Sequence, residues 1–376
     1  MKQVIVIMML VFCLMACIAP AACALEIEAT SAILIDADTG RVLFAQDAHR
    51  RLPVASLTKI LTALVTLEHD DNLSRLFTLP QDFVNVGESS IGLAAGETLT
   101  IEDLLYALML RSANDAGQAL ALAVAGNESA FAQMMNQCCA ELGLRESNWT
   151  NPHGLHHDAH LSSAYDMAYI TRAAMQIPMF NTLISTDTYT IPWEGHEEDR
   201  VVSSHNRLLT RYKGADGVKT GYTSQSGNCL VGSATRDGLR LIGVVLSCED
   251  TYGQMEELLD YGFAHYELRQ VAAFGDVLAR IPVVNGRANS VNALLGSNVI
   301  LLLPKGEEYL PEPELNLPEK LITPIDSQVP LGEVIFSDGA GNFKSVALFP
   351  ASDIESFTLG GMILSAFQSI LQVLLV

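Results

Sequence analysis

After the first 24 residues, the chain has two short apolar stretches, which are followed by apolar residues at helical spacing. Ser31 to Asp36 and Val42 to Ala45 lie on either side of the turn Asp38-Thr39-Gly40, which predicts a hairpin. From Pro53 onward the apolar residues recur three and four positions apart, and few positions are polar. This pattern predicts a helix that is buried over most of its surface.

Further helices are predicted from capping signals. Thr100 precedes two acidic residues in a predicted first turn and reads as an N-cap, with a helix that runs to about Leu110. Another helix is predicted from Asp115. Ser129 is expected to cap a third, and Gly143 to close it.

The second half of the chain changes to strands. Val218 to Thr223, Cys229 to Thr235 and Leu239 to Leu246 are joined by turns that contain glycine, which predicts an antiparallel meander. A helix from Tyr252 to about Tyr266 follows the meander. We therefore predict an α+β domain over residues 25–266, with an antiparallel sheet flanked by helices.

Proline, glycine and alternating apolar residues dominate the region after this helix. Val299 to Leu303, Gly332 to Phe336 and Lys344 to Leu348 read as strands. These segments predict a small all-β sandwich domain over residues 268–352.

The first 24 residues form a segment of their own. Lys2 precedes an uncharged apolar run from Val4 to Ala19, and Ala22-Cys23-Ala24 is a small-x-small cleavage pattern. This combination predicts a secretory signal peptide over residues 1–24, cleaved after Ala24; a membrane-spanning anchor is the alternative.

The C-terminal residues 358–376 carry no charge. Polar residues recur there at helical spacing and form one stripe against an apolar face, which predicts an amphipathic anchor helix. The pattern does not decide whether this helix spans the membrane or lies on it, and a core helix of the last domain is the alternative. Together the two ends predict a secreted protein anchored to the outer face of the cytoplasmic membrane.

The formal net charge of −21 restricts the possible partners. It argues against nucleic acid and against electrostatic attachment to anionic lipid, so any anchoring must be hydrophobic. Three of the seven cysteines lie within the signal segment. Cys229 and Cys248 fall out of register on the predicted meander, so no structural disulfide is expected.

Ser56-Leu57-Thr58-Lys59 places a hydroxyl and an amine one turn apart on the predicted buried helix. A buried lysine is either paired or loses its proton, and a neutral amine beside a serine is a general base beside a nucleophile. Taken alone, the motif also fits an N-capping serine and a snorkelling lysine.

Two further motifs favour the catalytic interpretation of Ser56 and Lys59. Ser112-Ala113-Asn114 lies where the predicted helix ends, and Lys219-Thr220-Gly221 lies in the first strand of the meander. Each alone fits an ordinary helix terminus or edge strand. The set S-x-x-K, S-x-N and K-T-G in this order is typical of serine β-lactamases and penicillin-binding proteins, although Ala113 stands where the second motif has aspartate.

With these motifs the chain resembles the low-molecular-mass penicillin-binding proteins, the serine D-alanyl-D-alanine carboxypeptidases. The resemblance runs from about Ala29 to Phe263 and continues more weakly through the β-rich region. The segments that carry it are Pro53 to Lys59, Ser112 to Ala116, Asn151 to Leu155, and Asp216 to Thr223.

The resemblance implies a role for each motif in cutting the terminal D-alanine from peptidoglycan stem peptides that end in D-Ala-D-Ala. Ser56 would attack the carbonyl of the penultimate D-alanine, and Lys59 would take its proton. Ser112 and Asn114 would relay protons and position the peptide. β-Lactam antibiotics would acylate the same serine, and no cofactor or metal is implied.

The third motif is expected to bind the substrate. Lys219 would supply positive potential, and Thr220 would hold the terminal carboxylate. Gly221 would let the substrate approach the backbone, and the N–H groups of Ser56 and Tyr222 would form the oxyanion hole.

One position departs from the family pattern. Where the family often has an arginine before the last helix of the catalytic domain, this chain has Thr251. A carboxylate without a nearby guanidinium is bound less well, which puts substrate affinity in doubt rather than the chemistry.

Parts of the sequence also fit three other functions. A β-lactamase would share the motifs, but no Glu-x-x-Leu-Asn segment lies between Asn114 and Lys219. A peptidoglycan-binding protein with a decayed site is favoured only by Thr251. A metal peptidase is suggested by a cluster of possible ligands, but Pro152 and Gly154 favour a loop there; the cluster consists of His153, His156, His157, His160 and Asp158.

Overall fold

The computed structural model describes residues 25–308 and 310–357, so the predicted signal peptide and C-terminal anchor lie outside the described residues. Two compact units divide the chain. The first runs up to Ala234 and includes Leu241–Tyr261, and the second takes Thr235–Arg240 and resumes at Gly262. Among the described residues, no helix is both long enough and apolar enough to cross a bilayer.

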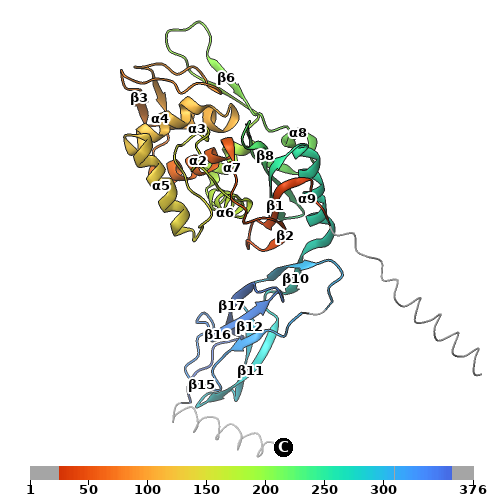
Figure 1. Ribbon diagram of the computed structural model, residues 1–376. Coiled ribbons are helices and arrows are strands. Elements are labelled where there is room, and N and C mark those ends of the chain that lie inside the picture. The colour runs from red at the N-terminus through yellow and green to blue at the C-terminus, as the bar shows by residue number, and fades with distance from the viewer. Residues whose placement is uncertain (1–24, 309, 358–376) are drawn as a thin grey trace, which may run out of the picture. The chain divides into compact units, whose positions relative to one another are not determined.

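A five-stranded antiparallel sheet is the centre of the first unit (Figure 1). The predicted hairpin and meander are confirmed, and β1 joins them by pairing with β9, so that Ile33 faces Val244. The spatial order of the strands is β2 (Val42–Gln46), β1 (Ala29–Asp36), β9 (Leu239–Cys248), β8 (Gly227–Arg236) and β7 (Ala215–Thr223).

Helices cover both faces of this sheet. On one face, a Cβ at Gly243 would lie 2.6 Å from the sulfur of Met255, so glycine allows α9 to pack closely against the strands. α8 lies on the same face, because a Cβ at Gly232 would lie 2.7 Å from Leu208 and 2.8 Å from Met255. On the other face the helices gather around α2, and α6 and α7 contact β1 and β7. The helices of this unit are η1 (Ala55–Leu57), α2 (Thr58–His69), α3 (Ile101–Leu110), α4 (Asn114–Ala125), α5 (Glu128–Glu141), α6 (Ala164–Ala174), α7 (Pro178–Ser185), α8 (Leu208–Arg211) and α9 (Thr251–His265).

The helix α2 is buried as predicted, including its polar residues. Thr62 and Thr66 are completely buried and donate hydrogen bonds to backbone carbonyls; Thr62 Oγ1 lies 2.6 Å from the oxygen of Pro152. These bonds offset the cost of burying hydroxyls and tie α2 to the loop around Pro152.

Two capping predictions have different outcomes. Thr100 caps α3 in a capping box with Asp103, as predicted. The prediction that Ser129 caps α5 is wrong, because the cap is Asn127, whose Oδ1 accepts from the N–H of Ala130 at 2.8 Å. Gly126 ends α4 in a left-handed conformation directly before it, which brings the next helix start forward.

Two small hairpins were not predicted. β3 (Leu76–Thr78) pairs with β4 (Thr98–Thr100), and β5 (Thr188–Ile191) pairs with β6 (Arg200–Ser203). The four described cysteines are free and buried in this unit: Cys138, Cys139, Cys229 and Cys248.

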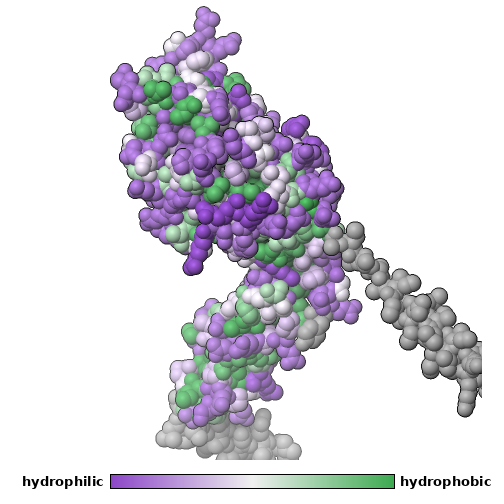
Figure 2. Space-filling view, viewed as in Figure 1, coloured by the Kyte–Doolittle hydropathy of each residue, from purple (hydrophilic) through white to green (hydrophobic). Residues whose placement is uncertain are grey.

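The second unit is an all-β domain in which two sheets share one apolar core. Leu301 and Leu303 from the two-stranded sheet pack in the same cluster as Leu295 and Val334 from the six-stranded sheet. Hydrophilic residues cover much of the visible face of each unit (Figure 2). The strands are β10 (Tyr266–Ala272), β11 (Val277–Val284), β12 (Ser290–Leu295), β13 (Val299–Pro304), β14 (Glu314–Asn316), β15 (Leu321–Ile322), β16 (Gly332–Ser337) and β17 (Phe343–Pro350).

Candidate active site

Ser56 lies in the turn η1, immediately before α2, and its hydroxyl is in contact with the amine of Lys59. Lys59 is completely buried, and its Nζ lies 2.9 Å from Ser56 Oγ, 2.8 Å from Asn114 Oδ1 and 2.5 Å from the oxygen of His153. A neutral amine has two donors and one lone pair. It can therefore donate to Asn114 and His153 while it accepts the proton of the Ser56 hydroxyl.

The surroundings of Lys59 favour this neutral form. Burial is the main cause of a pKa well below the usual value for lysine, and the nearby ammonium of Lys219 lowers this pKa further. Glu88 and Asp115 act in the opposite direction and do not cancel these effects. An amine that is neutral near pH 7 can serve as a general base.

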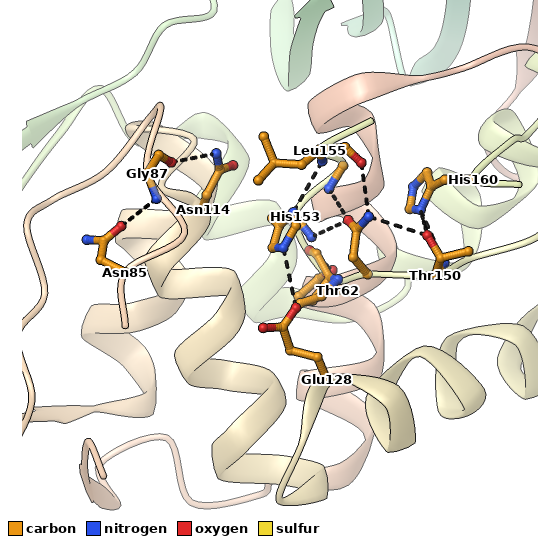
Figure 3. Close-up of polar contacts among 12 residues, drawn as sticks. Thr62, Asn85, Gly87, Asn114, Glu128, Thr150, His153, Leu155 and His160 are labelled. Atoms are coloured by element: carbon orange, nitrogen blue, oxygen red, sulfur yellow. Dashed lines mark hydrogen bonds and ion pairs between the residues drawn. The ribbon is translucent and has the colours of Figure 1, made fainter. Parts of the chain in front are cut away.

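Ser112 and Asn114 occupy the junction between α3 and α4. Ser112 is buried and has φ of 61°, a left-handed conformation that is uncommon for serine. Asn114 accepts from Lys59 and donates through Nδ2 to the oxygen of Gly87 at 3.1 Å (Figure 3). The Asn114 amide thus orients the amine of Lys59 and holds the loop at Gly87.

Asp115 fixes the same loop, a role that the sequence patterns did not suggest. Its carboxylate is completely buried and accepts from Asn85 Nδ2 at 2.9 Å, from Ser90 Oγ at 2.6 Å and from the N–H of Leu93 at 2.9 Å. The loop that carries Ser89 along the cavity wall is therefore tied to the start of α4.

The third motif lies on β7, against the turn that carries Ser56. Lys219 is buried, its Nζ donates to the oxygen of Thr220 at 3.1 Å, and burial lowers its pKa to about 7. A Cβ at Gly221 would lie 2.9 Å from the oxygen of Val54 and 3.2 Å from the nitrogen of Ser56. Only glycine therefore allows β7 to approach the nucleophile this closely.

A cavity of about 490 Å³ connects the three motifs. Of the predicted site residues, Ser56, Ser112, Thr220, Gly221 and Tyr222 line it. Lys59 contacts the cavity residue Ser56, Asn114 contacts Lys59, and Lys219 contacts the cavity residue Thr220. The wall also contains Thr251, the position that departs from the family pattern, and residues that the sequence did not indicate: His205, Arg207, Arg211 and Tyr252.

The segment Asn151 to Leu155 supports the turn at Ser56. Gly154 has φ of +87°, and a Cβ there would lie 2.0 Å from the oxygen of Ala55, so this position requires glycine. The backbone oxygen of His153 accepts from Lys59. This segment was identified only through the family resemblance, and its contribution is made largely by backbone atoms.

The suggested metal-binding histidines do not converge. His153 Nε2 lies 3.4 Å from Glu128 Oε2, whereas His160 Nδ1 contacts Thr150 Oγ1 at 3.2 Å (Figure 3). The other ring nitrogen of His160 contacts Thr58 Oγ1 at 2.8 Å. Their rings are thus engaged with different partners. In the part of the chain that the structure describes, no three His, Cys, Asp or Glu side chains are grouped as metal ligands.

Two families match successive parts of the chain. Residues 18–250 match the family described as D-alanyl-D-alanine carboxypeptidase, and residues 266–356 match the C-terminal domain of penicillin-binding protein 5. Residues 251–265 lie between the two matches, and the division between the two compact units, after Tyr261, falls among them.

Curated relatives and solved structures agree with these matches. The chain is 31% identical over 316 residues to D-alanyl-D-alanine carboxypeptidase DacF of Bacillus subtilis, with 82% of this chain and 81% of DacF covered. It is 31% identical to DacD of Escherichia coli, with 90% and 89% covered. Penicillin-binding protein 5 from Haemophilus influenzae has a TM-score of 0.69 at 28% identity, with 88% of this chain and 99% of that chain covered.

Proposed function

The chain belongs to the D-alanyl-D-alanine carboxypeptidase family, and we propose that Ser56 is the nucleophile with which it removes the terminal D-alanine from peptidoglycan stem peptides. It is a serine hydrolase of the penicillin-binding class. The observation that carries the assignment of Ser56 is the buried amine of Lys59, 2.9 Å from the Ser56 hydroxyl.

The first half of the reaction forms an acyl-enzyme. Lys59, neutral because it is buried, accepts the Ser56 proton as Oγ attacks the carbonyl carbon of the penultimate D-alanine. When the tetrahedral intermediate collapses, the C–N bond breaks and the leaving amine takes a proton through Ser112. D-Alanine departs, and water then hydrolyses the ester on Ser56.

The negative charge of the intermediate needs donors close to Ser56. We assign this task to the N–H groups of Ser56 and Tyr222, because the absence of a side chain at Gly221 lets β7 approach the Ser56 turn. Such donors contribute most when they are held in place before the substrate binds. The close packing of β7 against η1 supports this arrangement.

The proposed location is the outer face of the cytoplasmic membrane. It rests on the signal-like residues 1–24 and the amphipathic pattern of residues 358–376. The net charge of −21 leaves hydrophobic insertion as the means of attachment.

The direct test is D-alanine release by a purified chain of residues 25–357 from a peptide that ends in D-Ala-D-Ala. We expect release by the wild type, and a loss of roughly 1,000-fold or more in kcat for Ser56→Ala. Circular dichroism and thermal unfolding should show that the variant remains folded. Release by a folded Ser56→Ala variant at the wild-type rate would exclude Ser56 as the nucleophile.

A further inference from the structure

The cavity wall at α9 lacks the cation that a carboxylate substrate requires. Thr251, the first residue of α9, lines the cavity where the family pattern has an arginine. The neighbouring Glu249 and Asp250 also line it and are acidic. A terminal carboxylate bound here must therefore contact a cation supplied by another element.

We propose that Arg207, at the start of α8, binds the terminal carboxylate of the substrate and so replaces an arginine at position 251. Arg207 lines the same cavity as Ser56, Thr220 and Thr251. This inference rests on the proposed carboxypeptidase function and identifies a specificity-determining residue of that site.

The other cations near the cavity are already engaged. Arg211 Nε lies 2.9 Å from Glu256 Oε1, so a carboxylate of the protein already pairs with this guanidinium. The amine of Lys219 donates to the oxygen of Thr220. Among the described residues, Arg207 pairs with no carboxylate, so its guanidinium is available to a ligand.

His205 also lines the cavity but does not supply a positive charge there. Its Nε2 lies 3.0 Å from Arg111 Nη1, so the ring acts as an acceptor. Burial lowers the pKa of His205, and the charges of Arg111 and Lys219 lower it further. Because the His205 ring is neutral, Arg207 is the cation of this wall that no carboxylate pairs with among the described residues.

Tyr252 holds the guanidinium of Arg207 in place. The ring of Tyr252 is 8% exposed, and Arg207 Cζ lies 4.8 Å from its centroid. The backbone N–H of Arg207 donates to the Tyr252 hydroxyl at 3.2 Å, which fixes the start of α8 against the ring. Stacking occupies a face of the guanidinium and leaves its N–H edges free for bidentate binding of a carboxylate.

The test compares two peptides that differ only at the C-terminus, D-Ala-D-Ala and D-Ala-D-alaninamide, under steady-state conditions. We expect Arg207→Gln to lower kcat/KM for the acid about 10- to 100-fold, mainly through KM. The rate for the amide should change less than about twofold. The amide terminus is neutral and forms no ion pair with Arg207, so removing the guanidinium costs it little. The ratio of acid to amide is thus the diagnostic quantity.

Two matched variants complete the design. Lys213→Gln removes an exposed positive charge from the same segment and should leave the acid-to-amide ratio unchanged. Thr251→Arg, added to Arg207→Gln, restores a guanidinium at the position expected from the family and should recover at least about tenfold of the loss.

The outcomes separate this inference from the proposed function. Suppose that wild-type protein releases D-alanine. If Arg207→Gln then has the wild-type acid-to-amide ratio, whether both rates stay the same or fall equally, Arg207 does not bind the carboxylate. If wild-type protein releases no D-alanine from the acid peptide, the proposed function itself fails, and the inference fails with it.

Discussion

The amine of Lys59 is surrounded by three hydrogen-bond acceptors, and among the described residues no carboxylate pairs with it. An ammonium in such a site has no carboxylate in contact, and Glu88 and Asp115 compensate its charge only in part, whereas a neutral amine satisfies all three contacts. Because burial disfavours the protonated form of Lys59, the amine stays neutral and can accept a proton as a general base. Lys219 is also buried, which lowers its own pKa, and its charge lowers the pKa of Lys59 further.

The pH dependence of acylation should follow these two amines. The rate rises with pH as Lys59 loses its proton, because only the neutral amine can accept the proton of Ser56. The rate falls again above about 7, the pKa of Lys219, as the cavity loses positive potential. The measurement is kcat/KM for D-alanine release between about pH 5 and about pH 9.

Lys219→Arg is the control for this assignment. A guanidinium keeps its proton over the whole range, so the decline at high pH should disappear while the rise at low pH remains. A wild-type profile that stays flat across the range would contradict the roles of both lysines.

Gly221→Ala should damage catalysis without unfolding the protein. The added Cβ would lie 2.9 Å from the oxygen of Val54 and 3.2 Å from the nitrogen of Ser56, so β7 must move away from the nucleophile. We expect a fall of about 100-fold in kcat/KM, because small displacements of reacting groups are costly. Wild-type activity in this variant would show that the close approach is not needed for catalysis.

Among the helices and strands, the sequence predicted those that depend on local residue patterns. The hairpin, the meander, the buried helix α2 and the Thr100 cap all follow from turn residues, spacing and capping. The pairing of β1 with β9 joins segments about 200 residues apart, and such pairing depends on packing rather than on local pattern. The cap of α5 was misassigned because two suitable residues, Asn127 and Ser129, stand two positions apart.

The active site was predictable where side chains form motifs and not where backbone atoms or isolated residues act. Lys59 contacts both Ser56 of its own motif and Asn114 of the second motif, as their residue types suggested. The sequence did not indicate that the backbone carbonyl of His153 binds Lys59 or that Arg207 lines the cavity, because only the folded chain brings these groups into place.

His160 connects the start of α2 to the loop at Thr150 and should make stability depend on pH. Burial lowers its pKa to about 3 from an ordinary value of 6.5, so the folded state excludes a proton that the unfolded state binds below pH 6.5. Stability should therefore fall as the pH decreases from 6.5 toward 3, by about 1.4 kcal/mol per pH unit from this residue.

Urea unfolding of wild type and His160→Gln at pH 7 and pH 5 tests this linkage. The wild type should lose about 2 kcal/mol more than the variant between the two pH values, whatever the variant's stability at pH 7. Equal losses would mean that His160 is not held in its neutral form.

For the molecule as a whole, charge and hydrophobicity make separate predictions. A chain with a net charge of −21 gains little from anionic lipid, so its attachment should not depend on salt. We predict that the full-length protein sediments with membranes, resists a high-salt wash and is released by detergent. A chain that ends at residue 357 should stay in the supernatant.

Fractionation followed by immunoblotting measures this directly. Release of the full-length protein by salt alone would indicate attachment through charge, and sedimentation of the shortened chain would indicate that residues 358–376 are not the anchor.

The most direct test of the central claim is to treat the protein of residues 25–357 with a fluorescent penicillin and to map the labelled peptide. Our account predicts one long-lived adduct on Ser56, absent from Ser56→Ala and displaced by unlabelled penicillin. A folded wild-type protein that forms no adduct, or forms it on another residue, would contradict the assignment of Ser56 as the nucleophile.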